Sequence, residues 1–233
     1  MSLWRRATGP ALSAPQKERI ARWRALPAFD GDVLFEQARW CVVDVESSGL
    51  DVHRDRLIAI GAVPVEVKHV AIAEAFHRLL RQQGASSTEN ILIHRISGTE
   101  QLSGDEPAGV LLDFLQLVGN SPLVAFHARF DETMIRRALQ NVLGVRMRHR
   151  WLDLAVLAPA LDREAPATRR GLDDWLARYQ IVPLQRHNAL ADALATAQLL
   201  QVMFERARAQ GIKTVFELFA LTGNQRWLGG QEG

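Results

Sequence analysis

The chain has 233 residues, of which 48% are hydrophobic and 23% are charged, and its formal net charge at pH 7 is +2. This is the composition of a soluble globular protein that can bury a full core in one domain with extensions. No apolar run approaches the ~20 residues of a membrane helix, and no apolar stretch near the start makes a secretory signal. Because Cys41 is the only cysteine, no internal disulfide can form, and we expect a cytoplasmic protein without a membrane partner.

The basic residues are almost all arginines, since only Lys17, Lys68 and Lys213 are lysines among 28 basic residues. Arginine suits phosphate because its planar fork donates two hydrogen bonds to one anion. The base composition of a genome can also make a chain arginine-rich. The arginine count therefore leaves a nucleic-acid partner open.

A helix-start signal opens the segment 13–25. Ser13 can cap the helix, Pro15 suits its first turn, and Gln16 completes a capping-box pattern. Pro27 and the sequence FDGD end the pattern before residue 39. We interpret residues 1–38 as a basic helical extension that either packs on the main domain or contacts a partner.

From residue 40 the pattern changes to β-structure. Residues 40–46, 56–67 and 70–80 are rich in β-branched and apolar side chains, and their short links predict three strands that pair antiparallel. After a polar loop, a helix over 104–119, a short strand over 122–127 and a helix over 131–143 imply parallel crossovers. The remaining segments predict a mostly helical second half, with elements at 148–158, 170–179, 189–210 and 214–223. This order predicts an α/β fold with a mixed sheet flanked by helices.

Asp44 and Glu46 lie one residue apart in the first predicted strand, inside the apolar sequence VVDVE. Side chains alternate faces along a strand, so both carboxylates point the same way. Two like charges that project together need a compensating cation, and a divalent metal supplies it. An exposed acidic pair without a metal is the alternative interpretation.

Asp131 lies where the short strand 122–127 gives way to the next helix, where it would also suit an N-cap. We keep this capping interpretation for Asp153, Asp173 and Asp174.

His187 and Asp192 are separated by five residues at the start of an alanine-rich segment. In one continuous helix they would lie about 140° apart around the axis, so they can meet only if His187 is outside the helix. Pro183 opposes an early helix start, and Asn188 is a good N-cap. We therefore expect His187 on a loop and Asp192 in the first helical turn.

Taken in order, these residues resemble the catalytic set of the DEDDh 3′-to-5′ exonucleases, a family that includes the proofreading subunit of bacterial DNA polymerase III and ribonuclease T. The set is Asp44-x-Glu46 on a strand, Asp131 at a strand-to-helix junction, and His187 five residues before Asp192. The resemblance implies a ribonuclease H-like fold, a mixed five-stranded sheet whose first three strands are antiparallel. It covers residues 39–205 as the exonuclease domain and leaves residues 206–233 as a C-terminal helix and tail.

The resemblance also implies roles. Asp44, Glu46, Asp131 and Asp192 would hold two Mg²⁺ or Mn²⁺ ions through oxygen ligands, which such hard cations prefer. His187 would be the general base. The expected reaction is hydrolysis of phosphodiester bonds from the 3′ end of DNA, which releases nucleoside 5′-monophosphates in proofreading or repair.

The expected substrate-binding residues follow the first motif and precede Asp131: Ser47, Ser48, Gly49, Leu50 and His127. Ser47 and Ser48 stand where the family usually has two threonines. Phe126 and His127 stand where the family commonly has His and Asn, which leaves the contact of that Asn without a counterpart.

Two other functions stay open at this point. One is an RNA-trimming 3′-to-5′ exoribonuclease, because the choice between DNA and RNA depends on contacts at the 2′ position. The other is a catalytically silent, polymerase-associated nucleic-acid-binding module. The expected partners are single-stranded DNA or 3′ ends of duplex DNA, with RNA as the alternative substrate and a DNA polymerase as the candidate protein partner.

Overall fold

The computed structural model describes residues 11–165 and 171–223. The first ten residues of the predicted extension and residues 224–233 of the predicted tail lie outside this part of the chain. In order, the elements are α1 (Ala14–Arg24), β1 (Trp40–Ser47), β2 (Leu57–Glu66), β3 (His69–Val70), the 3₁₀ turn η1 (Ile72–Glu74), β4 (Phe76–Leu79), α2 (Thr88–His94), α3 (Gly98–Ser103), α4 (Pro107–Val118), β5 (Leu123–Ala125), α5 (Arg129–Leu143), β6 (Trp151–Asp153), α6 (Leu154–Leu161), α7 (Leu172–Arg178), α8 (Ala189–Ala209) and α9 (Val215–Leu221).

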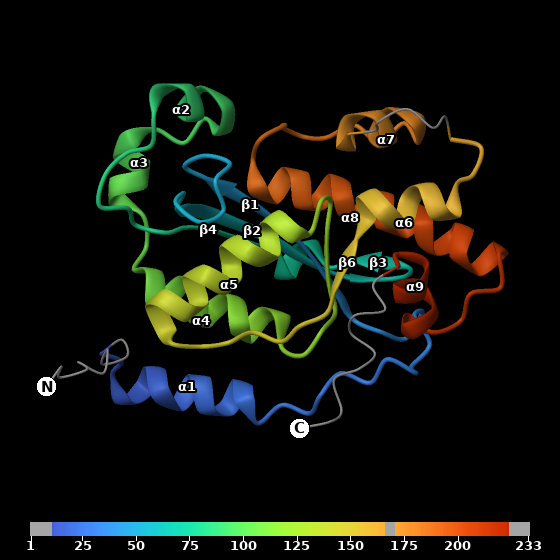
Figure 1. Cartoon of the computed structure of the whole chain (residues 1–233), viewed down its shortest axis with the longest axis horizontal. Coiled ribbons are helices and arrows are strands. Elements are labelled where there is room, and N and C mark those ends of the chain that lie inside the picture. Colours follow the sequence, from blue (N-terminus) through green and yellow to red (C-terminus); the bar gives the residue numbers. More distant parts are fainter. Residues whose placement is uncertain (1–10, 166–170, 224–233) are drawn as a thin grey trace, which may run out of the picture.

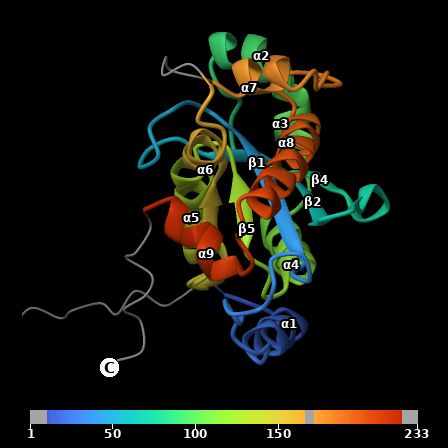
Figure 2. The same cartoon turned by 90° about the vertical axis from the view of Figure 1, so that its right-hand side faces the viewer.

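A mixed sheet forms the centre of the molecule, with helices on both of its sides (Figures 1 and 2). Its strands run in the order β3-β2-β1-β5-β6, and β4 also pairs with β2. Strand β2 is antiparallel to β1, β3 and β4, whereas β5 is parallel to β1 and β6 is parallel to β5. The predicted mixed sheet with an antiparallel first half is therefore confirmed.

The third predicted strand, residues 70–80, is interrupted, so the sheet has six strands rather than five. Both pieces, β3 and β4, pair with the same edge of β2, and η1 lies between them. Pro64 of β2 accepts a 2.9 Å hydrogen bond from the N–H of Ala71 at this point, and a proline offers no N–H in return. A sheet edge that lacks a donor tolerates a gap in its neighbour, which explains where the strand breaks.

Two other expectations were wrong in detail. The predicted polar loop before α4 contains the short helices α2 and α3, which begin at the capping hydroxyls of Ser87 and Ser97. The segment 148–158, predicted as helical, begins with the three residues of β6 before α6 starts. Three residues are too few to show the period of a strand, and β6 forms because β5 offers it a parallel partner.

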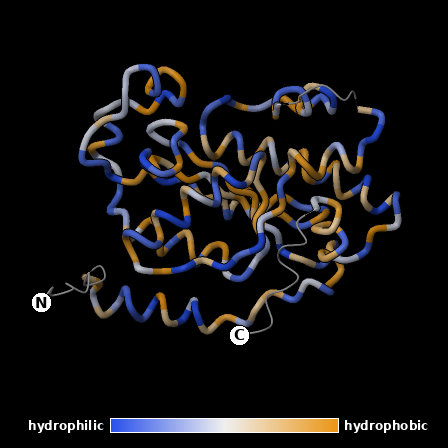
Figure 3. Tube along the Cα trace, in the orientation of Figure 1, coloured by the Kyte–Doolittle hydropathy of each residue, from blue (hydrophilic) through white to orange (hydrophobic). Residues whose placement is uncertain are grey.

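Two buried clusters cover the two faces of the sheet. Cys41, Val43 and Val45 of β1 pack with α4 and α5, whereas Trp40 and Val42 pack with α6, α8 and α9. Figure 3 shows the hydrophobic residues gathered along the central strands. This alternation along β1 determines that the side chains of Asp44 and Glu46 project on the α8 side.

The N-terminal helix α1 has the expected capping box at Ser13 and packs on α4. Arg19 forms a 2.6 Å ion pair with Asp113, and the indole N–H of Trp23 donates to the carbonyl of Gly119 at 3.1 Å. In the described part of the chain, no helix is both long enough and apolar enough to span a membrane.

Candidate metal centre and active site

The start of α8 lies directly against the sheet beside Asp44. Asp44 pairs with Gly61 of β2, and a Cβ atom on Gly61 would overlap the backbone of Ala189 and Leu190. Only glycine permits this close approach. The missing side chain of Gly61 thus brings the first turn of α8 next to the acidic residues of β1.

Asp192 lies in this first turn and is buried, with 5% of its surface exposed. Asn188 caps the helix by accepting a 3.1 Å hydrogen bond from the N–H of Ala191. His187 lies before the cap in a left-handed conformation, with φ of 58°, and its side chain is exposed. The expected placement of these three residues around a loop-to-helix junction is confirmed.

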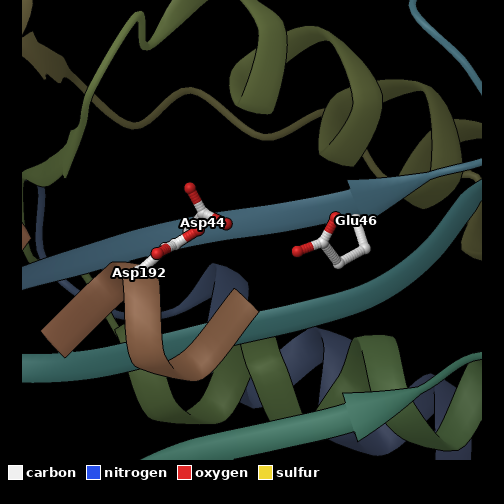
Figure 4. Close-up of side chains that lie close together, drawn as sticks. All are labelled: Asp44, Glu46 and Asp192. Carbon is white, nitrogen blue, oxygen red and sulfur yellow. The ribbon is translucent and has the colours of Figure 1, made fainter. Parts of the chain in front are cut away.

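Asp44, Glu46 and Asp192 form a carboxylate cluster in which one oxygen of each residue lies within 4.8 Å of the others. Figure 4 shows the carboxylates of β1 and α8 pointing toward one another. Hard divalent cations such as Mg²⁺ and Mn²⁺ prefer oxygen ligands, and a converging set of three carboxylates fits them.

The electrostatics of the cluster also favour a cation. Burial raises the pKa of Asp44 well above its usual range, and the nearby charges of Asp131, Glu46 and Asp192 raise it further. Burial and the charge of Asp192 raise the pKa of Glu46 to about 7. Like charges that stay this close resist ionisation until a cation compensates them.

Asp131 lies beside the cluster rather than within that group of three. It is buried in the first turn of α5, with 4% of its surface exposed, and its charge acts on Asp44. Burial raises its pKa, whereas hydrogen bonds from the backbone N–H groups of Asp131 and Val45 lower it. The N-cap of α5 is Ala128, so the capping interpretation of Asp131 was wrong.

The turn after β1 is held by its own side chains. The hydroxyl of Ser47 donates to the carbonyl of Gly49 at 2.6 Å, and the hydroxyl of Ser48 donates to Asp55 at 2.9 Å. Leu50 projects from this turn with 88% of its surface exposed. The two hydroxyls thus stabilise the turn from which the apolar side chain of Leu50 projects.

His127 lies between α5 and β5, the strand that runs parallel to β1. It is exposed and left-handed, with φ of 62°, and its backbone N–H donates to Asp153 at 3.0 Å. Asp153 also caps α6 through the N–H of Ala155, as expected.

Arg186 is a residue of this site that the sequence pattern did not reveal. Its guanidinium Nε donates to Oδ1 of Asp173 at 2.5 Å, and its Nη1 contacts Oδ1 of Asp192. The sequence could have indicated Arg186 only through its position directly before His187. In a chain with so many arginines, one arginine at such a position does not by itself indicate a site residue. The second partner of Arg186 is Asp173, for which the capping interpretation was wrong, because the N-cap of α7 is Gly171.

Several known proteins are similar to this chain in sequence. The family model RNase_T, described as an exonuclease, matches residues 41–200. The PolC-type DNA polymerase III of Thermotoga petrophila is 29% identical over 187 residues, which are 80% of this chain and 13% of that protein. The PolC-type DNA polymerase III of Bacillus subtilis is 29% identical over 186 residues, which are 79% of this chain and 13% of that protein. The chain therefore corresponds to a small part of these relatives.

Solved structures share the fold. The E. coli exonuclease I complex with a dT13 oligonucleotide has a TM-score of 0.61 at 19% identity, over 75% of this chain and 42% of that one. Exonuclease X in complex with 5′ overhanging duplex DNA has a TM-score of 0.59 at 22% identity, over 79% of this chain and 99% of that one. The predicted ribonuclease H-like fold class is thereby confirmed.

Proposed function

Because this chain belongs to the RNase_T family of exonucleases, of the DEDDh type, we propose that it removes nucleotides from the 3′ end of DNA and releases nucleoside 5′-monophosphates. The observation that carries the proposal is the convergence of Asp44, Glu46 and Asp192 beside a loop-borne His187. A proofreading or repair role fits this activity.

The carboxylate cluster would hold Mg²⁺ or Mn²⁺, and Asp131 would help to hold a second ion. When bound, two such ions supply Lewis-acid stabilisation of the phosphate and lower the pKa of a water molecule. The need for charge compensation supports this assignment, because burial and mutual repulsion raise the pKa values of Asp44 and Glu46.

His187 would take the proton from the attacking water at a ring nitrogen. The side chain is exposed and lies before the helix, so the imidazole can turn toward a nucleophile. The backbone N–H meanwhile keeps its hydrogen bond to Asp192. General-base catalysis of this kind contributes about 10²–10⁴-fold.

Leu50 and the turn that carries it would contact the terminal nucleotide. An apolar side chain that is 88% exposed, four residues after Glu46, can pack against a base without losing a core contact. Ser47, Ser48 and Gly49 would shape this turn, and His127 would contact the strand from the α5 side.

A basic groove along α5, the helix that carries Asp131, supports a polyanionic substrate. Its volume is about 520 Å³, and it is lined by the β1–β2 loop, by α5 from Thr133 onward and by the segment that follows α5. Arg136, Arg137 and Arg146 line it together with His53. Arginine side chains along a groove can follow the phosphates of a strand.

The extent of the enzyme is part of the same proposal. Residues 39–205 would form the exonuclease domain, with 1–38 as an extension and 206–233 as a C-terminal helix and tail. The similarity to PolC-type polymerases supports a DNA polymerase as the protein partner.

The test uses 5′-labelled single-stranded DNA, a mismatched duplex and RNA, each with Mg²⁺, with Mn²⁺ or with chelator. We expect a ladder that shortens from the 3′ end of DNA, only with a divalent ion, and no cleavage by the matched Asp44→Asn variant. Cleavage at internal sites would overturn the exonuclease assignment. Shortening of RNA alone would replace DNA by RNA as the substrate.

A further inference from the structure

Arg186 connects two helices at the edge of the carboxylate cluster. Its guanidinium contacts Asp173 in the first turn of α7 and Asp192 in the first turn of α8. The side chain of Arg186 is 28% exposed, that of Asp173 is 71% exposed and that of Asp192 is 7% exposed. The contact with Asp192 is therefore the one shielded from solvent, where charges interact most strongly.

One carboxylate oxygen of Asp192 forms an ion pair, and the other accepts a hydrogen bond. Oδ1 contacts Arg186, and Oδ2 accepts the N–H of His187 at 2.9 Å. A neutral N–H can share an oxygen with a metal ion, because a carboxylate oxygen has a second lone pair. A guanidinium cannot share it in the same way, because its positive charge repels a divalent cation at that distance.

The charge of Arg186 reaches the other two acids of the cluster as well. One carboxylate oxygen each of Asp44, Glu46 and Asp192 lies within 4.8 Å of the others, so a guanidinium in contact with Asp192 acts on all three acids. Arg186 thus already supplies part of the compensation that a metal ion would supply.

We propose that Arg186 is a built-in counter-ion of the carboxylate cluster, which competes with a divalent cation for Asp192 and so weakens the affinity of the site for metal. The inference rests on the proposed function only in that the cluster binds a divalent cation. A residue that positions Asp192 for the ion would instead strengthen the affinity of the site for metal.

The two roles differ in the sign of one measurement. Arg186→Gln keeps much of the stem and removes the charge, so a counter-ion role predicts that Mn²⁺ binds about tenfold more tightly to this variant, by calorimetry without substrate. A role in holding Asp192 predicts weaker binding. Arg186→Lys keeps the positive charge and should bind Mn²⁺ with an affinity closer to that of the wild type.

Thermal unfolding in chelator gives a second readout. Without Arg186 the carboxylates repel one another uncompensated, so Arg186→Gln should unfold at a lower temperature in chelator and recover most of the difference in Mn²⁺. If Arg186→Gln does not fold, Arg186→Ala is prepared in excess Mn²⁺. Its affinity for Mn²⁺ then tests the same expected increase.

Arg178 offers a matched control, because its Nε forms a 2.5 Å ion pair with the buried Asp162, outside the cluster. Arg178→Gln should lose stability without changing Mn²⁺ affinity. Unchanged or weaker Mn²⁺ binding by Arg186→Gln would overturn the counter-ion role and leave the exonuclease proposal intact, provided that the wild type binds Mn²⁺ and cleaves. A wild type that binds no Mn²⁺ would overturn both.

Discussion

The backbone N–H of His187 donates a 2.9 Å hydrogen bond to Oδ2 of Asp192, five residues further along the chain. The left-handed conformation of His187 and the cap at Asn188 turn the chain back on itself just before α8. On a single helix the two residues would lie on different faces. The spacing of five is therefore the mark of a loop-to-helix junction.

This junction allows the base to be tested apart from the metal ligands. His187→Asn keeps the backbone N–H and tolerates the left-handed conformation. We expect cleavage to slow by about 10²–10⁴-fold with little change in Mn²⁺ affinity. Single-turnover rates and calorimetry measure the two quantities, and a large loss of Mn²⁺ affinity would contradict the assignment of His187 as a base.

Electrostatic repulsion within the carboxylate cluster should lower the stability of the fold when no metal ion is bound. Asp44→Asn removes one of the mutually repelling charges, so we expect the variant to gain about 1 kcal/mol of stability in chelator, or ~2–4 °C in melting temperature. Divalent-dependent cleavage should disappear at the same time. Calorimetric unfolding and a labelled oligonucleotide measure both effects, and a variant that is less stable than the wild type in chelator would refute the repulsion argument.

Gly61 determines how closely α8 approaches the sheet. A methyl group at this position would overlap the backbone of Ala189 and Leu190, so Gly61→Ala must push the start of α8, with Asp192, away from Asp44. We expect a loss of about 3 kcal/mol or more in unfolding free energy, together with weaker Mn²⁺ binding.

Gly171→Ala is the matched control for Gly61→Ala, because a methyl group there meets no atom within 4 Å. It should cost less than about 1 kcal/mol and leave Mn²⁺ binding unchanged. Equal effects of the two substitutions in urea unfolding would contradict the close-approach argument.

We expect the buried Asp162, away from the cluster, to make the stability of the fold depend on pH in acid solution. A hydrogen bond from Arg178, supported by Tyr179 and by the charge of Arg206, lowers the pKa of Asp162 to about 2. The folded state therefore binds this proton less readily than the unfolded state. The stabilisation is fully present above the unfolded pKa of about 3.9 and is lost as the pH falls toward 2.

Asp162→Asn should remove this pH dependence. We expect the difference in unfolding free energy between wild type and variant to shrink by on the order of 2 kcal/mol between pH 5 and pH 2, at about 1.4 kcal/mol per pKa unit. Urea unfolding at several pH values measures it. A difference that stays constant over this range would show that Asp162 does not titrate as proposed.

Local patterns in the sequence were sufficient for much of the fold and of the site. The alternation around Asp44 and Glu46 determined that both face the same side of β1, and Pro183, Asn188 and the spacing to Asp192 determined that His187 precedes the helix. These features depend on residues within a few positions of one another, so the chain encodes them directly.

Only the tertiary structure decided the rest. Tertiary packing brings the charge of Asp131 close enough to act on Asp44, and it places Arg186 in contact with both Asp173 and Asp192. It also places the start of α8 against Gly61. It also broke the third strand opposite Pro64 and made a strand of residues 151–153. Each of these depends on which distant elements pack together, and neither propensity nor periodicity of a single segment carries that information.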